Sequence, residues 1–287
     1  LFPLEWAMAA WEQAVSARSA YRRMDQLLQG LQVQEGMELP EPKGKLEVEG
    51  AALAIQGRYL LRNISFSLQP GEHLGVIGPS GAGKTLLCRV LLGIWPSMGG
   101  KVRLDGADVY QWSSEQLGGQ VGYLPQEVGL LPGTVSENIA RFQEVDSEKV
   151  VAAARKAKVH ETILHLPQGY DTYLQAGGSN LSAGLRQRIG LARALYGSPS
   201  LVVLDEPNAH QDDVGENALL ECLKMLKQEG VTTVTVTQKP SLLSGVDRVL
   251  MLKAGQMAMF GPRQEVFERL AAKRQPSKQQ AARSHSA

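Results

Sequence analysis

Short apolar runs alternate with amphipathic stretches along the chain from Leu46 onward. The apolar runs have the length of strands and are rich in branched side chains, whereas the stretches between them repeat their apolar positions as helices do. We predict strands at 46–55, 64–68, 73–77, 121–125, 201–207, 231–236 and 248–253, and helices at 84–93, 214–227 and 264–272. Strands and helices that alternate in this way form a mainly parallel sheet covered on both faces.

The two ends of the chain depart from this pattern. Residues 1 to about 30 are typical of a helix that is apolar at first and becomes amphipathic and basic at Arg18, Arg22 and Arg23. We interpret residues 1–32 as the cytoplasmic end of a transmembrane helix; an amphipathic helix packed on its own domain stays the alternative. Residues 33–45 have the proline, glycine and charge of a linker. The polar residues 273–287 are expected to be disordered.

Composition narrows the class of protein. The formal net charge is +1 and 43% of the residues are hydrophobic, so the chain can form a core but has no large excess of positive charge. No nucleic-acid partner is therefore expected. No run of 18 apolar residues occurs that could cross a bilayer unaided. Cys88 and Cys222 lack the spacing of metal ligands and are typical of reduced core thiols.

A glycine-rich segment joins the strand at 73–77 to the helix at 84–93. Its sequence, GPSGAGKT, fits the phosphate-loop pattern G-x-x-x-x-G-K-[ST] in the required position between a strand and a helix. Glycines let the backbone wrap a phosphate, and the amides of residues 81–85 and the helix N-terminus attract the anion. The lysine reaches the β and γ oxygens, and the threonine hydroxyl binds Mg²⁺. The predicted phosphate site comprises Gly78, Pro79, Ser80, Gly81, Ala82, Gly83, Lys84, Thr85 and Leu86.

An acidic pair ends the apolar strand LVVLDEP. In a chain with a phosphate loop, Asp205 at the carboxyl end of this strand can hold Mg²⁺ through water, and Glu206 can polarise the attacking water. The alternative is an ordinary acidic pair on the surface. The apolar run before the pair favours the functional interpretation.

Five segments occur in the order found in the ATP-binding cassette (ABC) family, which the chain resembles. They are the phosphate loop, Gln126 in YLPQ, LSAGLRQRIGLARALYG, LVVLDEP and TQKPSLL. The resemblance covers about residues 46–272. It is greatest to bacterial type I secretion exporters of the protease- and lipase-exporting branch, through GYLPQEVGLLPGTVSENIARF, GLARALYGSPSLVVLDEPN and PEPKGKLEVEG. It implies an α/β fold of the ABC-type P-loop class, with an antiparallel β flank and an inserted helical subdomain at about residues 127–194.

The resemblance also implies roles for residues outside the phosphate loop. Gln126 would sense Mg²⁺ beside Thr85 and Asp205, which makes these three residues the expected metal site. Gln238 stands at the switch position near the γ-phosphate. Glu206, Gln238 and Gln126 are thus the expected catalytic set.

Three further residues are expected to act across a dimer. Ser182 and Gly184 would bind the γ-phosphate of the ATP held by the opposing subunit, and Asp212 would cross the interface. A serine at the start of a helix presents a hydroxyl and backbone donors to an anion. The alternative for Ser182 is simple N-capping, and both can hold.

The implied cofactors are ATP and Mg²⁺. The implied partners are a second ABC subunit, in a homodimer or a heterodimer, the chain's own transmembrane domain, a periplasmic adaptor and an outer-membrane channel. The implied location is the cytoplasmic face of the bacterial inner membrane. Alternatives are an exporter of lipid, peptide or small molecules, a soluble cassette ATPase, and a regulatory cassette that binds ATP with weak hydrolysis.

Four features depart from the family pattern. The LSGGQ signature is LSAGL here, with Ala183 and Leu185 at the changed positions. The switch histidine is Gln238, which can donate a hydrogen bond but cannot become positively charged. Leu86 replaces a frequent hydroxyl, and the adenine-stacking aromatic falls on Ile55, with Tyr59 nearby. Because Glu206 is retained, we hypothesise weak or asymmetric ATP hydrolysis.

Overall fold

The computed structural model describes residues 11, 13–25, 39–209 and 211–272. The chain divides into two units, Leu1–Met37 and Glu38–Ala287. In the first unit, residues 13–25 form an exposed helix. Among the described residues, no helix combines the length and apolar character that crossing a bilayer requires. The predicted disordered tail, residues 1–10, 12 and 26–32 of the predicted transmembrane helix end and residues 33–38 of the predicted linker lie outside the described residues. The domain boundaries stay a prediction.

The described part of the second unit contains one ten-stranded sheet in the order β5-β4-β1-β2-β12-β11-β3-β10-β9-β6. Five strands form its parallel part: β3 (His73–Ile77), β6 (Val121–Leu124), β9 (Leu201–Asp205), β10 (Thr232–Val236) and β11 (Arg248–Lys253). The flank contains β1 (Leu46–Ile55), β2 (Arg58–Leu68), β4 (Gly99–Leu104) and β5 (Ala107–Asp108), which pair antiparallel. β12 (Gln256–Pro262) pairs antiparallel with β11 and parallel with β2. The predicted fold class is confirmed.

The strand register sets where the site can form. Val236 at the end of β10 lies opposite Val76 of β3 on one side and Asp205 of β9 on the other, and Leu204 lies opposite Leu124 of β6. Because these strands are parallel, their carboxyl ends lie at one edge of the sheet. The loops after Ile77, Leu124, Asp205 and Val236 therefore leave the sheet as neighbours.

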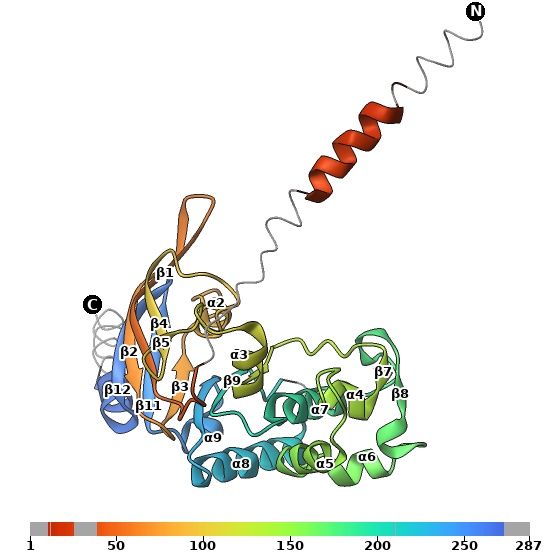
Figure 1. The fold of residues 1–287 in the computed structure, drawn as a ribbon. Helices are drawn as coiled ribbons and strands as arrows, with labels where there is room; N and C mark the ends of the chain where they lie inside the picture. Colours follow the sequence, from red (N-terminus) through yellow and green to blue (C-terminus); the bar gives the residue numbers. More distant parts are fainter. Residues whose placement is uncertain (1–10, 12, 26–38, 210, 273–287) are drawn as a thin grey trace, which may run out of the picture. The chain divides into compact units, whose positions relative to one another are not determined.

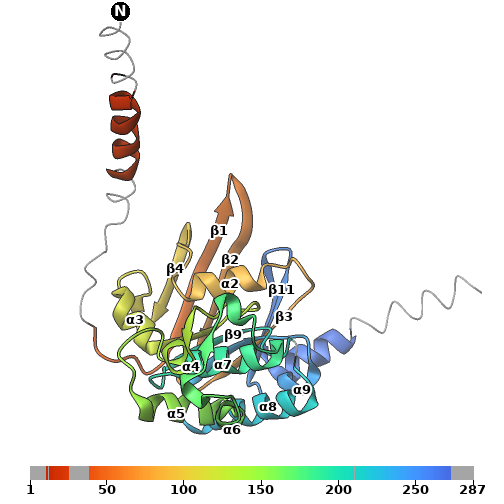
Figure 2. The same cartoon turned by 90° about the vertical axis from the view of Figure 1, so that its right-hand side faces the viewer.

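Helices cover both faces of the parallel strands. In both Figures 1 and 2, α2 (Lys84–Leu91) lies on one side of β3 and β9, and α8 (Asp213–Gln228) and α9 (Pro240–Leu243) lie on the other. Alternate side chains of β9 enter different cores, as strand geometry requires. Leu201 and Val203 pack with α2 and the antiparallel flank, whereas Val202 and Leu204 pack with α8 and the helical subdomain. A final helix spans residues 263–272.

A helical subdomain separates β6 from β9, where the sequence predicted one. α3 (Ser114–Gln120) precedes β6, and after β6 come β7 (Gly133–Thr134), α4 (Val135–Ile139), α5 (Ser147–Lys156), α6 (His160–Leu164), η1 (Gly169–Asp171), β8 (Tyr173–Leu174), η2 (Ala176–Gly178) and α7 (Ala183–Leu195). In Figure 1, α4 to α7 gather on the side away from β1, β2 and β12. A capping box between Thr134 and Glu137 begins α4, and Asp146 caps α5.

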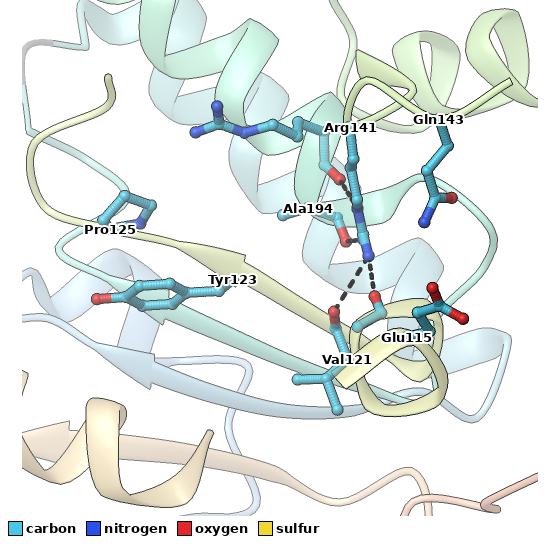
Figure 3. A pocket seen from close by; sticks show the side chains of 9 residues that line it. Glu115, Val121, Tyr123, Pro125, Arg141, Gln143 and Ala194 are labelled. Atoms are coloured by element: carbon cyan, nitrogen blue, oxygen red, sulfur yellow. Dashed lines mark hydrogen bonds between the residues drawn. The ribbon is translucent and has the colours of Figure 1, made fainter. Parts of the chain in front are cut away.

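Arg141 joins the helical subdomain to the sheet. Its guanidinium donates to the carbonyls of Arg193 and Ala194 at the end of α7, at 3.0 and 3.1 Å, and to those of Gly118 and Val121 beside β6 (Figure 3). Burial lowers the pKa of Arg141 from its ordinary value. Carbonyls at a helix C-terminus compensate a buried cation, since they are otherwise unpaired acceptors. Arg141 therefore fixes the C-terminal end of α7 relative to the strand that leads to Gln126.

A buried histidine predicts how stability depends on pH. His73 is 3% exposed and its Nε2 atom has no hydrogen-bond partner. Burial, and then the charge of Lys227, lower its pKa from 6.5 to about 4. The folded state thus holds His73 neutral while the unfolded state gains a proton below pH 6.5. The resulting stability is complete above pH 6.5 and is lost as the pH falls to 4, by up to about 3 kcal/mol.

We expect His73→Gln to reduce the loss of stability between pH 7 and pH 4.5, as measured by urea unfolding across that range. His165→Gln is the matched control, because His165 is exposed and its removal should leave the pH dependence unchanged. An identical pH dependence in the His73→Gln variant and the original protein would contradict the assignment.

Candidate functional site

The predicted phosphate loop curls between β3 and α2. Gly78 passes so close to β11 that a Cβ atom there would lie 2.3 Å from the carbonyl oxygen of Leu252, and Gly83 has a φ of +99°. Both positions therefore require glycine. The amide of Ala82 donates to the carbonyl of Pro79 at 3.2 Å, which closes the loop on itself.

The start of α2 offers unpaired donors to an anion. Gly83 is the N-cap, and no side chain caps this terminus, so its first amides are open to a ligand. The Lys84 ammonium donates to the carbonyls of Gly78 and Pro79 at 3.0 and 3.1 Å, inside the loop. A cation beside open amides is the arrangement that a polyphosphate fits. All the predicted phosphate-site residues lie in this segment, and their contact with a nucleotide stays a prediction.

The surroundings of the Asp205 carboxylate suit a bound cation. The residue is 1% exposed, and both carboxylate oxygens are buried without a hydrogen-bond partner of ordinary geometry. Burial raises its pKa and the nearby Glu206 adds to the rise, whereas the Thr85 hydroxyl and the Lys84 ammonium favour the charged form. An unpaired buried carboxylate is costly. A hydroxyl and a carboxylate beside a phosphate site suit the oxygen-preferring ion Mg²⁺, so Thr85 and Asp205 fit the predicted metal site.

Glu206 and Gln126 lie in contact, although they are 80 positions apart. The Gln126 Nε2 atom donates to the Glu206 Oε2 atom at 3.1 Å. Gln126 lies just beyond β6 and Glu206 just beyond β9, so the contact follows from the parallel pairing of these strands. The carboxylate that is predicted to act on water is thus oriented by the glutamine that is predicted to sense the metal.

Gln238 follows β10 at the same edge of the sheet. It lines a groove of about 810 Å³ together with Gly78 and Pro79 of the phosphate loop. Its neighbours are fixed by hydrogen bonds: Thr237 donates to Asn208 at 3.0 Å, and Lys239 pairs with Glu216 at 2.6 Å. The structure therefore places the switch position beside the phosphate loop, with the loop around it held in place.

The three residues expected at a dimer interface occupy helix starts. The Ser182 hydroxyl accepts from the amide of Leu185 at 3.3 Å and caps α7, and Gly184 follows in its first turn. Asp212 caps α8 by accepting from the amide of Gly215 at 2.8 Å. The capping alternative for Ser182 is confirmed. The contacts of Ser182, Gly184 and Asp212 with a second subunit stay predictions.

Leu185, one of the two changed residues of the signature segment, is a core residue. Its side chain is 7% exposed and belongs to the core of the helical subdomain. The adenine-stacking candidates stay undecided. Ile55 and Tyr59 are both exposed near the turn between β1 and β2, where Ala54 pairs with Tyr59, and the Arg62 guanidinium lies 5.4 Å from the centre of the Tyr59 ring.

Three polar residues at the site were not predicted. Gln187 donates to the Glu206 carbonyl at 3.2 Å, Gln211 donates to the Gly184 carbonyl at 3.5 Å, and Asn208 accepts from Thr237. A glutamine on the apolar face of a helix is the signal that could have identified Gln187, because a buried amide requires a partner.

Comparisons with known proteins show which proteins this chain resembles. A family model described as "ABC transporter" matches residues 61–209. "Type I secretion system ATP-binding protein PrsD" of Rhizobium meliloti (strain 1021) is 46% identical over 98% of this chain and 49% of that protein. "ATP-dependent lipid A-core flippase" of Syntrophus aciditrophicus (strain SB) is 34% identical over 82% of this chain and 39% of that protein.

A solved structure is similar over most of the chain. "Structure of a bacterial Atm1-family ABC exporter with ATP bound" has a TM-score of 0.75 and 28% sequence identity, over 83% of this chain and 42% of that chain. The chain thus spans about half, or less, of the length of the relatives to which it is similar.

The burial of Leu185 predicts the outcome of restoring the family glutamine. We expect Leu185→Gln to lower the free energy of unfolding by about 1–3 kcal/mol, because a carboxamide would enter an apolar core without a partner. The measurement is urea unfolding followed by circular dichroism. Leu131→Gln is the matched control, since Leu131 is 56% exposed and the same change there should cost less than about 0.5 kcal/mol. Equal stability of the two variants would contradict the burial of Leu185.

Proposed function

We propose that this chain, which belongs to the ABC transporter family, binds and hydrolyses ATP to power the export of a protein through a membrane. The observation that supports ATP hydrolysis best is the convergence at one sheet edge. At this edge lie the phosphate loop with Lys84, the uncapped start of α2, the unpaired carboxylate of Asp205 and the Gln126–Glu206 pair.

In this proposal the loop amides and Lys84 bind the β- and γ-phosphates of ATP. Thr85 and Asp205 hold Mg²⁺, which neutralises phosphate charge when it is bound. Glu206 accepts a hydrogen bond from a water molecule and makes its oxygen a better nucleophile towards the γ-phosphorus atom. A P–O bond to that water oxygen forms, the bond to the ADP oxygen breaks, and the proton lost by the water passes to Glu206 or to the phosphate formed.

Gln126 has two roles in this chemistry. Its amide holds the Glu206 carboxylate at 3.1 Å, which limits the directions in which the base can point. Its position at the end of β6, between the sheet and the helical subdomain, also suits a residue that reports the state of the metal site to the helical subdomain. Gln238 donates a hydrogen bond to the γ-phosphate, without the positive charge that a histidine could add.

The site is completed by a second cassette, in a homodimer or a heterodimer. In the proposed dimer, Ser182 and Gly184 at the start of α7 cover the γ-phosphate held by the opposing subunit, and Asp212 contacts the interface. Support comes from the uncapped amides of α2 and from the amides at the N-terminus of α7, since two such termini facing one polyphosphate share its charge.

Protein export is the cargo class we propose, because a relative that is 46% identical is described as a type I secretion system ATP-binding protein. The same proposal includes a transmembrane domain, a periplasmic adaptor, an outer-membrane channel and a location on the cytoplasmic face of the inner membrane. Export of a lipid is the second candidate, because a relative that is 34% identical is described as a lipid A-core flippase.

The neutral switch residue Gln238 favours slow ATP hydrolysis.

Two substitutions test the ATPase. Lys84→Ala should weaken MgATP binding about 10- to 100-fold, because a charge-assisted contact with phosphate is lost. Glu206→Gln should retain MgATP binding, lower phosphate release by about 10²- to 10⁴-fold and accumulate an ATP-bound dimer. The measurements are fluorescence titration with ATP, phosphate release and light scattering. Lys101→Ala, at an exposed position of β4, is the matched control. Normal ATP binding by Lys84→Ala, or a Glu206→Gln protein that forms no ATP-dependent dimer, would contradict the proposal.

A further inference from the structure

Glu206 has an unusual backbone conformation that its neighbours maintain. Its φ is +51°, in the left-handed region that side chains other than glycine rarely adopt. Its amide donates to the carbonyl of Val236 at 3.0 Å, and its carbonyl accepts from the amide of Ala209 at 3.0 Å. Strained backbone persists only where the surrounding contacts hold it. The position of the Glu206 carboxylate therefore depends on contacts made by the main chain of this residue.

Gln187 supplies one of these contacts from another part of the molecule. Its side chain is 3% exposed, and its Nε2 atom donates to the Glu206 carbonyl at 3.2 Å. Gln187 belongs to α7 of the helical subdomain, whereas Glu206 follows β9 of the sheet. A buried carboxamide without a partner would be costly, so this bond defines where α7 lies relative to the turn.

The same helix presents Ser182 at its start, five positions before Gln187. With a rise of about 1.5 Å per residue, the two residues are separated by about 7.5 Å of helix, which is short enough to move as one body. A second contact runs in parallel, since Gln211 donates to the Gly184 carbonyl at 3.5 Å. The start of α7 is thus connected to the segment that follows Glu206 at two points.

We propose that Gln187 is a positioning residue that couples the two ATP sites of the dimer. The inference rests on the proposed function, in which Ser182 contacts the ATP held by the opposing subunit. When that ATP draws the start of α7 into place, Gln187 moves with the helix and sets the Glu206 carbonyl. The base of one site then adopts its working position only when the other site is closed.

Two amide side chains hold Glu206 in this arrangement, and they come from different elements. Gln126 at the end of β6 binds the carboxylate, and Gln187 on α7 binds the main-chain carbonyl. The first contact can orient the carboxylate only if the second holds the backbone turn. A shift of α7 that depends on the partner's ATP therefore changes the position of the Glu206 carboxylate, which acts on water.

The test replaces Gln187 by Met, which has a similar length and no donor, and by Glu, whose carboxylate would face the Glu206 carbonyl. In the complete natural protein, both variants should bind MgATP with unchanged affinity and keep the KM for ATP within about twofold. The kcat should fall about 10- to 100-fold, as expected when a reacting group is misplaced by a fraction of an ångström to an ångström. The Hill coefficient for ATP should fall towards one. Gln168→Met, on the exposed surface of the helical subdomain, is the matched control and should match the original protein.

A second measurement needs neither ATP nor hydrolysis. Hydrogen–deuterium exchange of the peptide covering residues 205–209, in nucleotide-free protein, should be faster in Gln187→Met than in the original protein and in Gln168→Met. A Gln187→Met protein with original kcat, Hill coefficient and exchange rate would overturn the coupling.

The kcat could instead fall only in proportion to a loss of folded protein and of ATP affinity. That result would equally overturn the coupling, because it indicates a structural role. Should the original protein neither bind nor hydrolyse ATP, the proposed function fails and the coupling with it. The exchange experiment still decides whether Gln187 holds the turn, so the two failures are distinguishable.

Discussion

The parallel pairing of β3, β10, β9 and β6 is the constraint on which the site depends. Backbone hydrogen bonds set the strands in register, so that Val76, Val236, Asp205 and the end of β6 reach one edge together. Four segments far apart in the sequence then leave the sheet side by side. The loop after β3 contributes open amides and the Lys84 ammonium, and the segment after β10 contributes the amide of Gln238. The end of β9 contributes the carboxylates of Asp205 and Glu206, and the segment after β6 contributes Gln126, which binds Glu206. Without this register no single loop would hold a complete site.

Burial at the edge makes the site costly and defines its chemistry. Both carboxylate oxygens of Asp205 are buried without a hydrogen-bond partner of ordinary geometry, and Glu206 has a backbone conformation that is unfavourable for its residue type. Structures retain such features where a ligand or a reaction requires them, since unpaired buried charge and backbone strain each oppose folding. In the proposed function, a magnesium nucleotide would relieve the first cost by supplying a cation to the carboxylate. The second cost is offset by the hydrogen bond that the Glu206 amide donates to the Val236 carbonyl, and by the bonds that the Glu206 carbonyl accepts from Ala209 and Gln187.

The sequence identified candidate site residues but not the contacts that support them. The strands at 46–55, 73–77 and 248–253 were predicted to the residue, because their apolar runs are bounded by turn residues. β12 was missed, since its Met, Ala and Gly residues have little strand preference and pair only because β11 provides an edge. The apolar helix face around Gln187 signals a buried amide, but the partners of Gln187 and Arg141 could not be predicted. These partners lie 19 and up to 55 positions away and depend on how the helical subdomain packs. Leu185 shows the same limit: the sequence marks it as a changed signature residue, whereas its place in the core follows from the packing of α7.

The fixing of α7 at both ends explains how a helical subdomain can act on a site in the sheet. At its C-terminal end, the carbonyls of Arg193 and Ala194 accept from Arg141, which also binds the carbonyls beside β6. Near its N-terminal end, Gln187 binds Glu206. A helix held only at its C-terminus could rotate about Arg141 without disturbing the base. Because it is also bonded to Glu206, any displacement of the α7 start must either break that hydrogen bond or move the turn. In the proposed reaction, both results would change the geometry around the attacking water, so the position of one helix would control whether Glu206 can act as the base.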